Sequence, residues 1–104
     1  MPRNPLLKGL PPIHPGASLR EIVFPALGKS KVEIARLLGV SRQTLYDVLN
    51  EKQPITANLA LRIGKLVGGG PEIWLRMQSR YDLEIAEKLL AKEIKRIPTL
   101  EAAE

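Results

Sequence analysis

The segment 30–50, SKVEIARLLGVSRQTLYDVLN, constrains the fold of this chain more than any other. Ser30 and Glu33 form a capping-box pattern, in which each side chain can bond a backbone N–H that the start of a helix leaves free. An apolar stripe follows, and Gly39 ends this helix where a left-handed backbone is needed. Ser41 caps a second helix at once. Two short helices joined by a tight turn are typical of a helix-turn-helix, which makes DNA the first partner to consider.

The second helix, expected from Arg42 to Leu49, carries one apolar and one polar face. Its apolar residues recur at helical spacing, so we expect them in the core. A recognition helix enters the major groove by its N-terminal end, and its first exposed residues then meet base edges. We therefore predict base-reading roles for Arg42, Gln43, Thr44 and Tyr46.

These residue types suit the edges of bases. Arg42 offers a pair of donors that fits guanine O6 and N7, and Gln43 fits adenine N6 and N7. Thr44 can contact a thymine methyl group or a phosphate. For Arg42, a phosphate contact or a solvated charge is the alternative. Asp47 faces the same negative groove, where it can meet a cytosine amino group or orient a neighbouring side chain.

Contacts to phosphates should come from the ends of the two helices. The N-terminus of a helix favours an anion through its free N–H groups and its dipole. We assign phosphate contacts to Ser30, Lys31, Ser41, Asn50 and Lys52. For each lysine, a merely solvated charge is the alternative. Because one such motif reads few bases, we expect a homodimer on a palindromic operator, with half-sites about one turn (~10 bp) apart.

The composition limits the other classes of function. The chain of 104 residues has a net charge of +5, and residues 28–65 hold seven Lys or Arg against three acidic residues, which suits double-stranded DNA. The chain has no cysteine and no apolar run near the ~18 residues that span a membrane, so we expect a cytoplasmic protein without membrane contact. The only histidine, His14, has no cysteine or acidic cluster near it in sequence. We therefore expect no metal, no cofactor and no catalysis.

Proline and glycine divide the rest of the chain. Residues 1–13 are rich in proline and predict a flexible arm, and a first helix can begin near Ala17 or Ser18 and end at Pro25. Thr56 should cap a fourth helix. Its expected core residues are Leu59, Leu61, Ile63, Leu66 and Val67.

A fifth helix should close the domain. The triple glycine at 68–70 ends the fourth helix, and Pro71 fits the first position of the fifth. We expect a domain over 14–83, a continuation of the last helix over 84–97 and a tail over 98–104. Trp74 and Tyr81 lie seven residues apart on one face of this helix. Core packing is one interpretation, and a surface for a dimer or another partner is the other.

Three stretches together resemble the HigA-type antitoxins, a branch of the Xre/Cro-like helix-turn-helix proteins. His14-Pro15-Gly16 with Leu19-Arg20-Glu21 is similar to the family's HPGExLxE opening, although Ala17-Ser18 stands where an acid is common. The central and closing likeness is carried by Val40–Gln43, Asn50–Lys52, Ile55–Ala57, Ala60–Arg62, Trp74-Leu75, Gln78 and Tyr81–Leu83. The triple glycine departs from the family's commoner Gly-Thr/Asn-Ser.

The resemblance implies an all-α, compact five-helix, lambda-repressor-like domain with an extended C-terminal helix. It implies a dimer that represses its own operon and neutralises a HigB-like toxin, a RelE-type mRNA endonuclease. The base-reading role falls by position on Arg42, Gln43, Thr44 and Tyr46. Two alternatives remain open: a stand-alone Xre-family repressor without a toxin, and a protein-interaction module whose DNA binding is vestigial.

Overall fold

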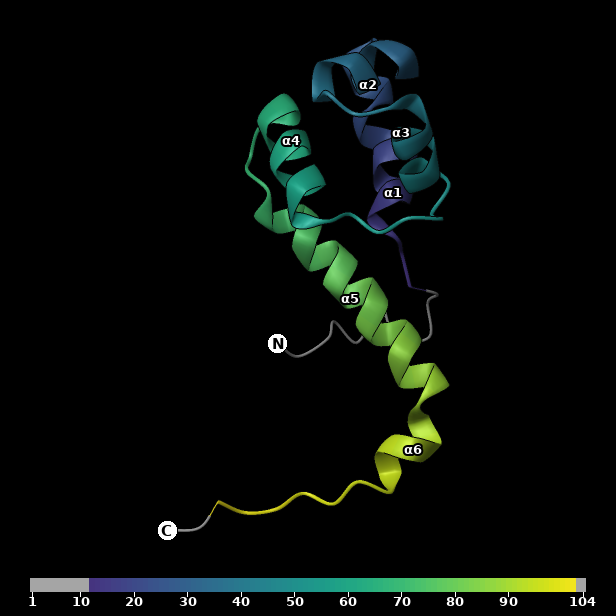
Figure 1. The fold of residues 1–104 in the computed structure, drawn as a ribbon, viewed down its shortest axis with the longest axis vertical. Helices are drawn as coiled ribbons and strands as arrows, with labels where there is room; N and C mark the ends of the chain where they lie inside the picture. The colour runs from purple at the N-terminus through teal and green to yellow at the C-terminus, as the bar shows by residue number, and fades with distance from the viewer. Residues whose placement is uncertain (1–11, 103–104) are drawn as a thin grey trace.

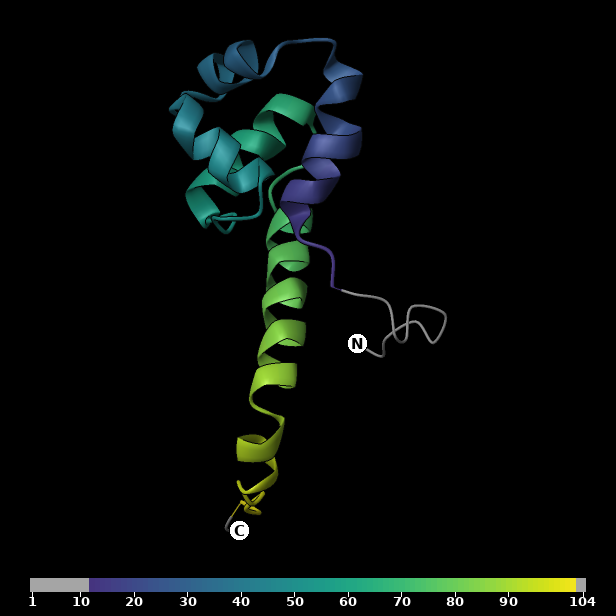
Figure 2. The same ribbon diagram turned by 90° about the vertical axis from the view of Figure 1, so that its right-hand side faces the viewer.

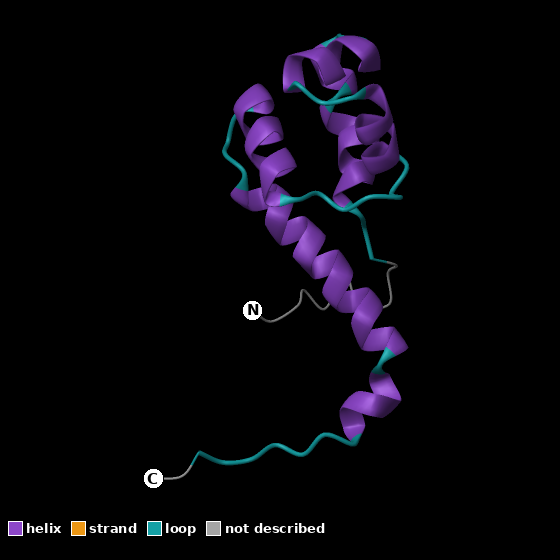
Figure 3. Cartoon of the chain, in the orientation of Figure 1, coloured by secondary structure: helices purple, strands orange, loops and turns teal. Residues whose placement is uncertain are grey.

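The computed structural model describes residues 12–102, and within that range all secondary structure is helical (Figure 3). The predicted all-α class is therefore confirmed. In chain order the elements are α1 (Pro15–Ser18), the π-helical turn η2 (Leu19–Val23), the 3-10 turn η3 (Pro25–Leu27), α2 (Lys31–Leu38), α3 (Arg42–Leu49), α4 (Ala57–Val67), α5 (Glu72–Leu89) and α6 (Ala91–Lys95).

The helices form a head and a stalk (Figure 1). The elements from α1 to α4 gather at one end of the molecule. α5 starts beneath this head and runs away from it (Figure 2), and its buried residues, Trp74 and Gln78, lie in its first half. α6 and the C-terminal segment follow beyond the head. This arrangement leaves α2 and α3 on the outside of the head, far from the end of the stalk.

One apolar core holds the head together. Thirteen buried apolar side chains form it: Leu19, Phe24, Ile34, Ala35, Leu38, Leu45, Val48, Leu49, Ile55, Leu59, Ala60, Ile63 and Trp74. The predicted stripes of α2 and α3 are thus confirmed. In α4 the prediction of a buried Leu61 is wrong, because this side chain is 61% exposed while Ala60 is fully buried. The buried positions of α4 are 59, 60, 63 and 64, and Leu61 points away from that face.

Three predicted helix caps are confirmed. The side-chain oxygens of Ser30, Ser41 and Thr56 each accept a hydrogen bond from the N–H three residues later, over 3.0 to 3.3 Å. The capping box at α2 is only half formed, because the Glu33 carboxylate instead accepts hydrogen bonds from the Arg36 guanidinium. Gly39 has a φ of 72° and ends α2 as expected.

α1 begins earlier than the sequence predicted. His14 caps it and Pro15 takes its first position, so the start lies before Ala17. The cap is an imidazole nitrogen that accepts an N–H bond, which is not among the usual capping groups of serine, threonine, aspartate and asparagine. The predicted arm lies mostly outside the described residues, which include only its last two members, Pro12 and Ile13.

The last helix is shorter than predicted. Pro71 lies one residue before α5, as its cap, and α5 ends at Leu89 rather than continuing unbroken to Ile97. Leu90 leaves the helical conformation (φ −107°, ψ 12°) before α6 begins. α6 has no buried residue, so no tertiary packing holds it in line with α5.

Candidate nucleic-acid interface

α3 presents the polar face that a recognition helix needs. Its three apolar residues are buried in the head, which turns the opposite face of the helix outward. Arg42, Gln43 and Thr44 are exposed, and Tyr46 is half-buried one turn later. The four residues predicted to read bases therefore share α3, three of them in its first turn and Tyr46 one turn later. Their contacts with DNA remain predictions.

Two of these side chains are held by close neighbours in the chain. The Gln43 amide nitrogen donates to a carboxylate oxygen of Asp47 over 2.7 Å, one turn along the helix. The Ser41 hydroxyl donates to the Thr44 hydroxyl oxygen over 2.8 Å and accepts from the Thr44 N–H. Ser41 thus uses its hydrogen within the cap, and the Thr44 hydroxyl hydrogen is the better donor for a phosphate.

The other predicted phosphate contacts lie at helix ends. Ser30 and Lys31 are exposed at the start of α2, and Asn50 and Lys52 are exposed just after α3. The Ser30 hydroxyl already accepts from the Glu33 N–H. Close by, the Arg36 guanidinium donates to the Glu33 carboxylate and holds its pKa below the ordinary value. Both helices of the motif therefore expose positive or donor groups where phosphates are expected.

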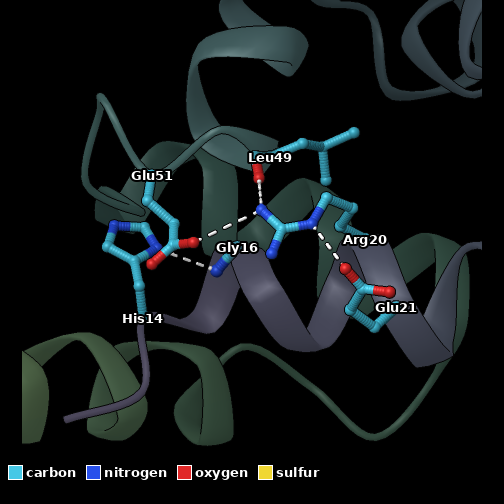
Figure 4. Close-up of polar contacts among 6 residues, drawn as sticks. All are labelled: His14, Gly16, Arg20, Glu21, Leu49 and Glu51. Atoms are coloured by element: carbon cyan, nitrogen blue, oxygen red, sulfur yellow. Dashed lines mark hydrogen bonds and ion pairs between the residues drawn. The ribbon is translucent and has the colours of Figure 1, made fainter. Parts of the chain in front are cut away.

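Arg20 fastens the end of α3 to the first helical segment (Figure 4). Its guanidinium donates to the Leu49 carbonyl over 2.5 Å, to a Glu51 carboxylate oxygen over 3.3 Å and to Glu21 over 2.8 Å. Glu51 lies in the left-handed region with a φ of 63°. Sequence reasoning missed this role, since nothing local indicates a partner 29 residues away.

Arg62 binds the C-terminal end of α2, as Arg20 binds that of α3. Its guanidinium donates to the Leu38 carbonyl over 2.9 Å and to the Asn58 side chain over 2.7 Å. In the sequence, Arg62 is one of the basic residues of the segment expected to bind DNA. In the structure, it completes the C-terminal end of α2, where carbonyl groups lack helical partners.

His14 joins the start of α1 to α5. Its Nδ1 accepts from the Gly16 N–H over 2.9 Å (Figure 4), and its ring meets Tyr81 of α5 edge-on, with centroids 5.0 Å apart. Burial lowers the pKa of His14, although the nearby carboxylates of Glu51 and Asp82 oppose that shift. A neutral imidazole is required here, because Nδ1 must accept a hydrogen bond.

The two residues predicted on one face of α5 have different surroundings. Trp74 is 6% exposed and packs in the core, which is the first of the two interpretations that the sequence left open. Tyr81 is half-buried against His14. Between them, the Gln78 side chain is buried, accepts from the Ile55 N–H over 2.8 Å and donates to Asp82. A partner surface on this face remains a prediction.

Other kinds of site are not evident in the described part of the chain. Within residues 12–102, no three His, Asp or Glu side chains gather into a group that fits a metal ion. None of the helices there has the length and apolar character needed to cross a bilayer.

Comparison with known proteins points in the same direction. A helix-turn-helix family model, HTH_3, matches residues 18–75. "Virulence-associated protein I" of Dichelobacter nodosus is 40% identical over 79 residues, which is 76% of this chain and 73% of that protein.

Two solved structures share the fold over nearly all of their length. The antitoxin GraA is 38% identical with a TM-score of 0.82, covering 88% of this chain and 100% of GraA. The Pseudomonas aeruginosa antitoxin HigA, solved with the higBA promoter, is 34% identical with a TM-score of 0.81, covering 86% and 99%. These findings confirm the resemblance that the three sequence stretches indicated. They describe DNA-binding regulators and not enzymes.

Proposed function

The chain belongs to the helix-turn-helix family HTH_3, and from this membership we propose that it is a DNA-binding antitoxin that represses its own operon. The observation that carries the proposal is the exposed polar face at the N-terminal half of α3. Arg42, Gln43 and Thr44 are exposed there, on a helix whose opposite face is buried in the core. The similar antitoxin HigA was solved with its promoter.

The proposed binding mode places α3 in the major groove. Arg42 and Gln43 read base edges with Tyr46 one turn behind, and Thr44 meets a methyl group or a phosphate. Lys31 and Lys52 contact phosphates on either side of the groove. Arg20 and Arg62 support this binding mode indirectly, because each donates to the last carbonyl group of one motif helix.

The stalk supports the proposal of a homodimer. The face of α5 that carries the buried Trp74 continues as Tyr81, Ile85 and Leu89, which become more exposed as the helix leaves the head. Leu89 is 74% exposed. An apolar helix face that is only partly covered in one chain favours a second copy of that chain. Two copies would present two α3 helices to a palindrome with half-sites about 10 bp apart.

The antitoxin role adds a protein partner. We propose that the chain neutralises a HigB-like, RelE-type toxin that cleaves mRNA, and that both act in the cytoplasm. The support is the similarity to the antitoxins GraA and HigA over almost their whole length. The alternative is a stand-alone repressor, which shares the same interface on α3 but lacks the toxin.

Co-expression tests the two roles separately. The neighbouring open reading frame is expressed with and without this chain, and growth is followed. We expect the neighbour to arrest growth and the chain to restore it. The variant Arg42→Ala/Gln43→Ala should still restore growth but lose repression of a reporter placed behind its own promoter. A harmless neighbour with intact repression would leave the stand-alone repressor as the function.

A further inference from the structure

Asp47 places a negative charge on the face of α3 that the proposed function brings into the major groove. A carboxylate in that position is repelled by the phosphates on both sides. In the structure it is not simply solvated, since its Oδ1 accepts the Gln43 amide hydrogen over 2.7 Å. Both residues lie in α3, one helical turn apart, so the pair moves with the recognition helix as one unit.

This hydrogen bond fixes which way the Gln43 amide points. A carboxylate can only accept hydrogen bonds, so Asp47 can hold the NH₂ group of Gln43 but not its carbonyl oxygen. The NH₂ group then has one hydrogen left, and the carbonyl oxygen Oε1 remains free to accept. The outer edge of the side chain therefore offers one donor and one acceptor in a fixed order.

We infer that Asp47 makes Gln43 select adenine, by holding its amide in a single orientation. Adenine presents the N7 acceptor beside the N6 donor, which matches the donor and acceptor that Gln43 has left. Guanine presents two acceptors, N7 and O6, and would set its O6 against Oε1 of Gln43. An amide free to turn could offer its NH₂ group to guanine. Asp47 is thus a specificity-determining positioning residue; this inference rests on the proposed DNA binding.

The competing account is an ordinary surface pair. Glutamine and aspartate four residues apart on a helix also stabilise it slightly in the absence of any ligand. That role predicts a small change in stability and no change in base preference. The substitution Asp47→Asn separates the two accounts, because asparagine can hold either end of the Gln43 amide and keeps nearly the same shape.

The full chain is tested on a pool of randomised DNA duplexes, selected and sequenced. Loss of one preferred base in Gln43→Ala identifies the base pair that Gln43 reads. Affinities are then measured by anisotropy for the selected duplex and for one with adenine replaced by guanine there. The control variant Glu84→Gln removes one negative charge on α5, at an ion pair with Arg80. Circular dichroism and thermal unfolding verify that each variant is folded.

The expected result is a change in discrimination together with a gain in affinity. The wild-type chain and Glu84→Gln should prefer adenine over guanine at least about fivefold. Asp47→Asn should reduce that ratio to about twofold or less while binding both duplexes more tightly, since a repulsive charge is gone. A preserved ratio in Asp47→Asn, or a Gln43 position that does not select adenine, overturns the inference alone. If the wild-type chain selects no sequence, the proposed operator binding fails, and the inference fails with it.

Discussion

The Arg20 guanidinium donates a hydrogen bond of 2.5 Å to the carbonyl of Leu49, the last residue of α3. Arg62 makes the equivalent bond of 2.9 Å to Leu38, the last residue of α2. Each helix of the motif thus has a C-terminal carbonyl satisfied by an arginine from outside the motif. These bonds tie the end of each motif helix to the rest of the head, so we expect their loss to affect DNA binding as well as stability.

Replacing Arg20 should therefore lower both stability and operator affinity. Arg20→Ala leaves the Leu49 carbonyl without its charged donor, so the urea midpoint of unfolding should fall. Operator affinity should fall several-fold with it, because the end of α3 is no longer held. Arg20→Lys should recover little of either, because an ammonium cannot reach Leu49, Glu51 and Glu21 together. The matched control is Arg76→Ala on the exposed side of α5; an equal loss there would contradict the assignment.

Gly16 packs so closely against α3 that no larger residue fits in its place. A Cβ added there would lie 2.0 Å from the Val48 carbonyl oxygen, which belongs to α3. Gly16→Ala should therefore destabilise the head by about 3 kcal/mol or more, measured by urea unfolding. Gly28 is the control position. It has a φ of 65°, but no neighbouring atom lies within 4 Å of the place that a Cβ would take. Gly28→Ala should cost only about 1 kcal/mol, from backbone strain alone.

The buried His14 should make stability fall as the pH drops below the ordinary histidine pKa of 6.5. Its pKa is lowered in the folded state by burial, so the unfolded chain binds the proton more readily. Stability is then fully present above the unfolded pKa of 6.5 and is lost as the pH falls toward the folded value. The slope from one such group is at most about 1.4 kcal/mol per pH unit.

His14→Asn provides the control for this pH dependence. Asparagine is a good N-cap and does not titrate in this range. The variant should lose stability at all pH values, because the contact with Tyr81 is gone. Its unfolding free energy should lack the part of the pH dependence that begins near pH 6.5 in the wild-type chain. A slope equal to that of the wild-type chain would assign the effect to other groups.

Local features of this fold were predictable from the sequence, and those that depend on distant residues were not. The caps at Ser30, Ser41 and Thr56 need only residues three positions apart. The same locality explains the buried faces of α2 and α3. By contrast, the bond from Arg20 to Leu49 and the contact between His14 and Tyr81 join segments that the sequence does not place together.

The wrong predictions also concern features that depend on residues distant in the sequence. The prediction of a buried Leu61 rests on its apolar character, but the face that α4 turns inward is set by its neighbours in space. The break at Leu90 is also beyond pattern reasoning, since the residues around it favour a helix and only the end of tertiary packing separates α5 from α6. In the candidate interface, Arg42, Gln43 and Thr44 are exposed as the sequence predicted, whereas Tyr46 is half-buried. The sequence left open whether Asp47 meets a base or orients a neighbouring side chain, and in the structure it accepts a hydrogen bond from Gln43.

Lys31 should contribute to DNA affinity without regard to sequence. It is exposed at the first position of α2, where the helix N-terminus also favours a phosphate. Lys31→Ala should weaken binding to the operator and to random duplexes by similar factors. The slope of log affinity against log salt should become shallower by about one unit. A slope that stays the same across a salt titration would remove Lys31 from the interface.

Arg42 should behave in the opposite way, because a base contact is lost only where the right base is present. It is exposed at the first position of α3, the part of a recognition helix that lies deepest in the groove. Arg42→Ala should cost about 1 to 3 kcal/mol on the selected operator and much less on random DNA. Anisotropy titrations at one fixed salt concentration measure both values. Equal losses on the two duplexes would mean that Arg42 binds a phosphate, and the base-reading surface would then begin at Gln43.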